Sequence, residues 1–241
     1  MTRTAWFDTS LPRILAHRGL ATGAPENGLE AFANALDAGA THLETDVRAS
    51  QDGVAVLHHD PRLADGRLVA ELSLDALRLA VPGLCTVPEA LAALPGARFN
   101  LDVKASEAIE PLAVALRQSS ARSRVLVTSF GPRRRRAALK RIPGVATSAS
   151  ADGVALALAG IRLGAHGLAR AALAGVDAVQ IPERLLGTDA TTPWFIDALH
   201  RAGVEVHYWV VNNGARMREL VARGADGIVT DRPDVAADAL R

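Results

Sequence analysis

Short apolar runs of strand length alternate along this chain with longer segments of helical periodicity, and this alternation constrains the fold more than any other feature. The predicted strands are Arg13–Ala16, His42–Val47, Val54–His59, Arg98–Val103, Val125–Ser129, Val145–Ser148, Ala178–Ile181, Val204–Val210 and Gly227–Thr230. The clearest predicted helices are Gly28–Ala38, Pro88–Leu94, Glu107–Gln118, Pro193–Arg201 and Ala215–Arg223. Such alternation is typical of an α/β fold built on a parallel sheet.

The nine predicted strands are one more than a β/α barrel needs, and the spacing identifies the extra one. Only a tight turn fits between Val47 and Val54, whereas a parallel crossover needs a connection of a dozen or more residues. We therefore expect Val54–His59 to run antiparallel to His42–Val47. The predicted fold is a single-domain (β/α)8 TIM barrel spanning residues 1–241, with an extra β-hairpin arm after the second strand. A doubly wound open sheet is the alternative.

The length and composition of the chain fit one globular barrel domain of 241 residues. The formal net charge of +1 indicates neither a nucleic-acid partner nor an anionic membrane surface. Cys85 is the only cysteine, which excludes an internal disulfide. No apolar run approaches the roughly 20 residues that span a bilayer, and no apolar signal region precedes the first strand. We therefore expect a soluble, cytoplasmic protein without stable membrane insertion; the sequence carries no signal for an oligomeric state.

Two predicted strands carry charged residues where a barrel strand should be apolar. Glu44 and Asp46 are two positions apart and share one face of their strand, as do Asp102 and Lys104 on another. Unpaired buried carboxylates cost several kcal/mol each, so three that converge at the strand ends call for a cation. Oxygen ligands of this kind suit Mg²⁺ or Ca²⁺ better than zinc. A buried ion-pair network that includes Arg18 is the alternative.

The predicted hairpin places a histidine beside these carboxylates. Centring its turn pairs Asp46 with about His58 and Thr45 with about His59, so one of the two imidazoles must lie near the acidic strand end. His17 closes the first strand, which neighbours the second strand in a barrel. Two histidines that flank a bound anion can act as general base and general acid near neutral pH. We interpret the remaining histidines as structural: His42, His166, His200 and His207.

Taken in order, these residues resemble the glycerophosphodiester phosphodiesterase family. The matching segments are Leu15-Ala16-His17-Arg18-Gly19, Pro25-Glu26-Asn27, Glu44-Thr45-Asp46-Val47, Asp52-Gly53 followed by His59-Asp60, Asn100-Leu101-Asp102-Val103-Lys104, Thr128-Ser129-Phe130, Tyr208-Trp209-Val210-Val211-Asn212 and Gly227-Ile228-Val229-Thr230-Asp231. A lone His-Arg-Gly would be a weak signal, but the whole set is collinear from the first strand to the last.

The resemblance implies a metal-dependent phosphodiesterase that hydrolyses small-molecule glycerophosphodiesters to glycerol 3-phosphate and an alcohol. It implies His17 and His59 as the acid/base pair, and so favours His59 over His58. One divalent cation, Mg²⁺ or Ca²⁺ with Mn²⁺ as a further candidate, would be held by Glu44, Asp46 and Asp102. The phosphate and the rest of the substrate would contact Arg18, Lys104 and Trp209.

The chain departs from the family pattern at several places. The family commonly has Glu where Asp102 stands, so this ligand is one methylene shorter. Gly28 replaces the Thr of the family's Pro-Glu-Asn-Thr segment, and residues 61–66 compress a longer stretch, which predicts a more open pocket. Asn27 and Asp231 match the family, but we interpret both mainly as helix caps. The arginine run 133–136 is expected to form a solvated helix face, with an anion-binding or membrane-surface patch as the alternative.

Two other functions are compatible with the same residues. A lysophospholipase-D-like hydrolase or lyase would act on larger lipid phosphodiesters, although no exposed amphipathic or aromatic membrane-docking stretch stands out and aromatic residues make up only 4% of the chain. A non-catalytic phosphate- or metabolite-binding barrel is the other, but such a protein would not need an acid/base pair.

Overall fold

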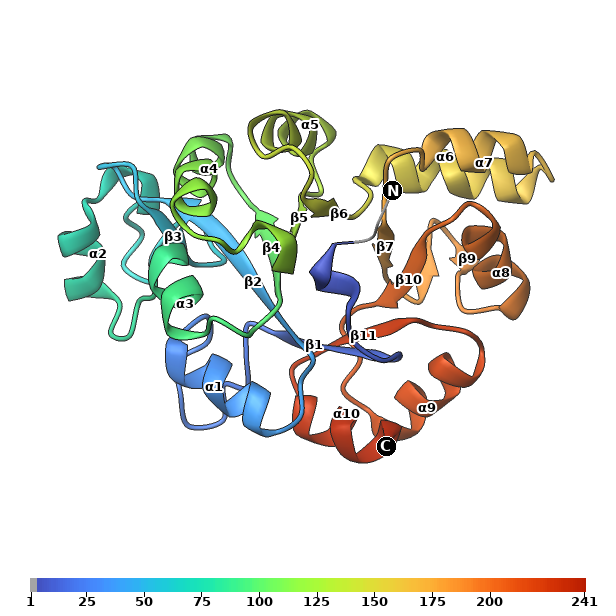
Figure 1. The fold of residues 1–241 in the computed structure, drawn as a ribbon, viewed down its shortest axis with the longest axis horizontal. Coiled ribbons are helices and arrows are strands. Elements are labelled where there is room, and N and C mark those ends of the chain that lie inside the picture. The colour runs from blue at the N-terminus through green and yellow to red at the C-terminus, as the bar shows by residue number, and fades with distance from the viewer. Residues whose placement is uncertain (1–3) are drawn as a thin grey trace.

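Eight parallel strands form the barrel, and β3 pairs antiparallel with β2 outside the ring (Figure 1). The protein is described here by a computed structural model that covers residues 4–241. The parallel strands are β1 (Arg13–His17), β2 (His42–Ala49), β4 (Phe99–Val103), β5 (Val125–Thr128), β6 (Ala146–Thr147), β7 (Ala178–Ile181), β10 (Glu205–Tyr208) and β11 (Gly227–Thr230). A parallel bridge between Ser148 and Ala178 joins β6 to β7 and closes the ring. The predicted barrel is therefore confirmed, and the doubly wound sheet is wrong.

Helices surround the strands (Figure 1). They are α1 (Leu29–Asp37), α2 (Leu74–Ala80), α3 (Val87–Ala93), α4 (Ile109–Gln118), α5 (Pro132–Arg141), α6 (Ala151–Arg162), α7 (His166–Ala172), α8 (Pro193–Arg201), α9 (Gly214–Ala222) and α10 (Pro233–Leu240). Leu101 and Val103 are buried in the core against these helices, which turns Asp102 toward the barrel interior. None of the helices described between residues 4 and 241 is long and apolar enough to cross a membrane.

The extra strand β3 (Ala55–Leu57) runs antiparallel to β2, with Val47 opposite Leu57. The His58 backbone N–H donates to the Asp46 carbonyl at 3.0 Å, which confirms the predicted pairing of these two residues. A second, smaller hairpin of β8 (Arg184–Leu185) and β9 (Thr188–Asp189) was not predicted, because strands of two residues are too short to show a periodic pattern.

Residue type and spacing explain where several helices begin and end. Thr86 and Glu89 form a reciprocal capping box at the start of α3. Gly39, Gly203 and Gly224 follow the ends of α1, α8 and α9 with φ of 103°, 91° and 109°, a region that favours glycine. Residue type and spacing therefore account for both kinds of helix boundary.

The predicted caps at Asn27 and Asp231 are wrong. The N-cap position of α1 is Gly28, and the buried Asn27 side chain instead accepts a hydrogen bond of 2.6 Å from the Thr45 hydroxyl of β2. The N-cap position of α10 is Arg232, and no side chain caps that helix. In both cases a neighbouring strand, rather than the local sequence, determines where the polar side chain binds.

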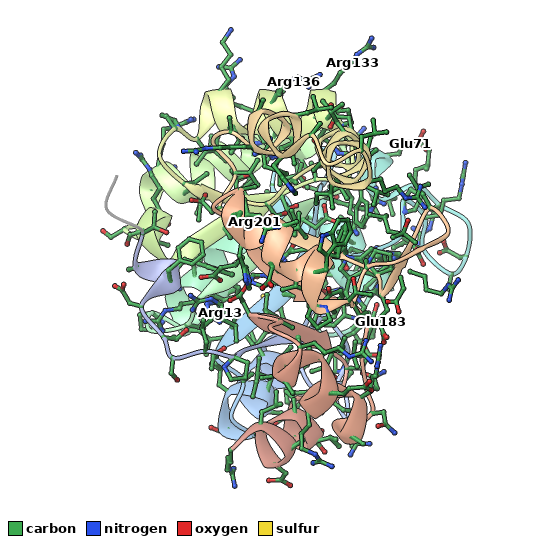
Figure 2. The ribbon with its side chains drawn as sticks, turned by 90° about the vertical axis from the view of Figure 1, so that its right-hand side faces the viewer. Arg13, Glu71, Arg133, Arg136, Glu183 and Arg201 are labelled. Atoms are coloured by element: carbon green, nitrogen blue, oxygen red, sulfur yellow. The ribbon has the colours of Figure 1, made fainter. Side chains whose placement is uncertain are left out.

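The arginine run at the start of α5 divides into two pairs. Arg133 and Arg136 are exposed and point away from the body of the molecule (Figure 2), as expected for a solvated face. Arg134 donates to the Val103 carbonyl at 2.7 Å, and Arg135 donates to the Thr147 hydroxyl at 3.1 Å. The inner pair therefore fastens α5 to the carboxyl ends of the barrel strands.

The N-terminal segment closes the opposite end of the barrel, at the amino ends of the strands (Figure 1). A 3₁₀ turn at Ala5–Phe7 buries Trp6 completely, and its indole N–H donates to the Phe99 carbonyl at 3.0 Å. Nearby, the buried Arg13 guanidinium binds both oxygens of Glu205 at 2.7 and 2.9 Å. The residues described from position 4 onward therefore fill this end of the barrel, and the active site of a β/α barrel forms at the other end, where the strands have their carboxyl ends.

The buried His42 beside this seal makes the stability of the fold depend on pH. Burial, helped by the positive charges of Arg13, His207 and Arg98, lowers the pKa of His42 from 6.5 to about 3. The unfolded chain therefore binds one more proton below about pH 6.5, so stability is fully present above that pH and declines as the pH falls toward 3. We expect the free energy of unfolding in urea to fall between pH 7 and 5.

The substitution His42→Gln removes this titration, while its amide can still donate to the Trp6 carbonyl that His42 Nε2 contacts at 2.8 Å. We expect a smaller slope of unfolding free energy against pH in this variant than in the native chain. His166→Gln, at an exposed position on α7, should keep the native slope. Equal slopes in all three proteins would contradict the assignment.

Candidate active site

A cavity of about 660 Å³ opens at the carboxyl ends of the barrel strands. All of the predicted site residues line it, and they come from segments far apart in the sequence. They are His17 at the end of β1 and Arg18 after it, Glu44 and Asp46 from β2, His59 after β3, Asp102 from β4 and Lys104 after it, and Trp209 after β10. The structure therefore brings the whole predicted set to one place.

Cationic side chains are inserted between the buried carboxylates. The Lys104 Nζ atom lies 2.8 Å from Asp46 Oδ1 and 2.6 Å from Asp102 Oδ2. Arg18 Nε lies 3.1 Å from Asp46 Oδ2, and its Nη1 contacts Glu26. Burial acts to lower the pKa of Lys104, but Asp102 and Asp46 outweigh it and raise that pKa. Both cations thus stay charged at the edge of the cavity.

The carboxylates are incompletely satisfied by these partners. Burial, followed by repulsion from Asp46 and Asp102, raises the pKa of Glu44 well above its usual value. Burial likewise raises the pKa of Asp102. Within residues 4–241, neither Glu44 Oε2 nor Asp102 Oδ1 has a hydrogen-bond partner. Buried oxygens without partners are costly, and a further cation beside them would remove that cost.

The donor set fits a hard cation in its chemistry, because it consists of carboxylate oxygens. Glu44, Asp46 and Asp102 are the residues that could hold one. In the described part of the chain, no three acidic, histidine or cysteine side chains are grouped closely enough to enclose a metal ion. The buried ion-pair network, which the sequence offered as the alternative to a metal site, is present here, with the Lys104 ammonium between Asp46 and Asp102.

His17 is held by a carboxylate that the sequence analysis assigned to a helix cap. Its Nδ1 lies 2.7 Å from Asp231 Oδ1, and its Nε2 lies 3.9 Å from Glu44 Oε2. Asn212 Nδ2 donates to Asp231 Oδ2 at 2.7 Å. Burial acts to raise the pKa of Asp231, but hydrogen bonds from His17 and Asn212 lower it. The strand order of a closed barrel could have predicted this contact, because β11 pairs with β1 and Ala16 lies opposite Thr230.

His59 lines the cavity, whereas His58 does not. The Nδ1 atom of His59 lies 2.8 Å from Asp60 Oδ1, and its backbone carbonyl accepts two bonds from Arg48, at 2.9 and 2.7 Å. His58 Nδ1 instead contacts the Asp60 carbonyl. Both His17 and His59 therefore have Nδ1 on a carboxylate, which leaves Nε2 of each ring available to a ligand.

Replacing Lys104 with Met should destabilise the fold, because the buried carboxylates of Asp46 and Asp102 would lose their shared cation. Removing one partner of a buried ion pair costs about 3 kcal/mol or more. We expect a loss of that size in urea unfolding measured with EDTA present. Lys140→Met, at an exposed position of α5, should change stability by less than about 0.5 kcal/mol. Equal stability of the two variants would show that the bridge contributes nothing.

Known proteins share this fold and much of this sequence. The chain matches the Glycerophosphoryl diester phosphodiesterase family over residues 17–235. It is 39% identical over 236 residues to "Probable glycerophosphodiester phosphodiesterase 2" of Mycobacterium tuberculosis, an alignment that covers 94% of this chain and 89% of that protein.

Solved structures show the same architecture. A glycerophosphodiester phosphodiesterase from Agrobacterium tumefaciens superposes with a TM-score of 0.78 at 23% identity, covering 95% of this chain and 99% of that one. A phosphodiesterase from Oleispira antarctica, solved in complex with the product sn-glycerol-3-phosphate, gives a TM-score of 0.76 at 23% identity, with coverage of 95% and 97%. Since the family match spans most of the chain and the relative in M. tuberculosis aligns over nearly its whole length, this chain is an enzyme that belongs to the glycerophosphoryl diester phosphodiesterase family.

Proposed function

We propose that this enzyme hydrolyses glycerophosphodiesters to glycerol 3-phosphate and an alcohol, using His17 and His59 as its acid/base pair. The observation that carries the proposal is the meeting of two carboxylate-anchored imidazoles, two cations and three buried carboxylates around one cavity. A phosphodiester is an anion whose cleavage needs charge neutralisation and two proton transfers, and this set supplies both.

The phosphate is bound by Arg18 and Lys104 in this proposal. The Arg18 guanidinium offers a planar fork of donors and the Lys104 ammonium a point charge, which suit phosphoryl oxygens. One histidine removes a proton from the nucleophile through Nε2, and the other donates a proton from Nε2 to the departing alkoxide. Asp231 holds the His17 ring in the orientation that these proton transfers require, and Asp60 holds the His59 ring in the same way.

A divalent cation, Mg²⁺, Ca²⁺ or Mn²⁺, is the proposed cofactor. It would be held by Glu44, Asp46 and Asp102. Two of their oxygens, Glu44 Oε2 and Asp102 Oδ1, have no hydrogen-bond partner within residues 4–241. When bound, it supplies positive charge that stabilises the phosphoryl oxygens. A cytoplasmic location and a small-molecule substrate belong to the same proposal.

The first test is release of glycerol 3-phosphate from glycerophosphocholine, with EDTA, Mg²⁺, Ca²⁺ and Mn²⁺ compared. We expect release that EDTA abolishes and a divalent cation restores. Asp102→Asn should remove this response, because the amide carries no charge, whereas Asp102→Glu should retain it. Release that is insensitive to EDTA would reject the metal and keep the reaction; no release from any glycerophosphodiester by the folded enzyme would reject the reaction itself.

The histidine roles are tested by substitution. His17→Ala and His59→Ala should each lower kcat by about 10²–10⁴-fold, the usual contribution of a positioned acid or base. His166→Ala, at an exposed position on α7, is the matched control and should keep native turnover. Near-normal turnover in both His17→Ala and His59→Ala would overturn the assignment.

A further inference from the structure

The cavity has two sides of opposite chemistry. All of its charged and histidine lining residues lie between His17 and Lys104 in the sequence, and the lining residues after position 104 are uncharged. The opposite side, called here the apolar wall, consists of Phe130, Val154, Ile181, Leu186, Trp209 and Val210. Phe130 follows β5, Val154 lies in α6 and Ile181 ends β7. Leu186 lies between β8 and β9, and Trp209 and Val210 follow β10.

A polar floor lies between the two sides. Asn100 and Gln180 hydrogen-bond to each other across the barrel at 3.2 Å, and the hydroxyls of Thr128 and Ser148 contact each other at 2.5 Å. All four residues line the cavity. Amide and hydroxyl groups suit the two free hydroxyls of a glycerol unit, whereas the apolar wall offers them no partner. The second alcohol of the phosphodiester is therefore the one that faces the apolar wall.

The apolar wall carries no carboxylate that could pair with a cationic alcohol. The carboxylates that line the cavity, Glu44, Asp46 and Asp102, lie in the charge cluster on its other side. Of the two rings, Phe130 already has the Lys104 ammonium 5.7 Å from its centroid and stands edge-to-face with Trp209. The other four side chains are aliphatic. A quaternary ammonium would find no carboxylate on this wall, and Trp209 would be the one wall ring left to it, whereas a hydrocarbon could contact all six side chains.

Leu186 has a backbone conformation that is unfavourable for leucine. Leu186 and Gly187 form the two-residue turn between β8 and β9, with φ of 47° and 77°. Such a turn favours Asn-Gly, and a leucine in this left-handed region is disfavoured by about 1 kcal/mol. Burial in the core does not offset this cost, because the side chain is 70% exposed. The Leu186 side chain lines the cavity, so an apolar ligand there would provide the apolar contacts that the rest of the protein does not.

We propose that the alcohol released by this enzyme is apolar, an alkyl or other hydrocarbon-bearing alcohol that lies along the apolar wall and under Leu186. The inference rests on the proposed function and adds the class of leaving group. The glycerol 3-phosphate part stays at the charged side and polar floor, while the hydrocarbon of the leaving alcohol is removed from water by Phe130, Val154, Ile181 and Leu186.

The test is a series of substrates that share glycerol 3-phosphate and differ in the alcohol: the ethyl, butyl, hexyl and choline esters. We expect kcat/KM to rise about threefold to fourfold for each added methylene that the wall covers, and the choline ester to rank below the butyl ester. A flat series, or a preferred choline ester, would overturn the apolar leaving group while leaving the proposed reaction intact. Release from none of the four would reject the proposed reaction.

Leu186→Asn gives a variant test that does not depend on fold damage. Asn suits the left-handed turn position, so the melting temperature should be equal or higher, while the ratio of kcat/KM for the hexyl over the ethyl ester should fall severalfold. Leu79→Gln is the matched control, because Leu79 is 89% exposed on α2 and does not line the cavity. An unchanged ratio in Leu186→Asn would overturn the role of the wall.

Discussion

The placement of buried charge on the inner faces of β2 and β4 is the constraint on which the rest of this structure depends. Asp46 and Asp102 are opposite each other in the parallel register of these strands, and Asp46 is 1% exposed. Two carboxylates this close and this buried would repel each other and lose hydration, and the Lys104 ammonium between them offsets both effects. The barrel thus concentrates its electrostatic cost at one end, while Trp6 and the Arg13–Glu205 pair seal the other.

Strand periodicity explains why so much of the fold and of this charge cluster was predictable. A residue spacing of two places Glu44 with Asp46, and Asp102 with Lys104, on one face without any knowledge of the tertiary structure. The short connection after Val47 permits only a hairpin, and centring its turn placed Asp46 opposite about His58, a pairing that the structure confirms. These inferences succeeded because each rests on local chain geometry and not on a particular tertiary contact.

The roles of Asn27 and Asp231 were not predictable by the same means. An Asn or Asp just before a helix looks the same whether it caps that helix or turns toward a neighbouring strand. The choice depends on which acceptor or donor the barrel places nearby: the Thr45 hydroxyl for Asn27 and the His17 ring for Asp231. Closure of the barrel makes β11 a neighbour of β1, so a topological argument could have found Asp231, whereas a local motif could not.

The apolar wall could not be predicted from the sequence for a related reason. Its residues come from separate loops, a helix and a strand end, so no continuous segment is amphipathic or aromatic. The charged lining residues come from the first half of the sequence and the uncharged wall from the second half, and this division has a consequence for the mechanism. The groups that we propose bind phosphate and move protons lie between residues 17 and 104, whereas the proposed surface for the leaving alcohol is built on later segments such as the β8–β9 turn. Substitutions in those loops can therefore change which alcohol is accepted without disturbing the balance of buried charge that the barrel needs to stay folded.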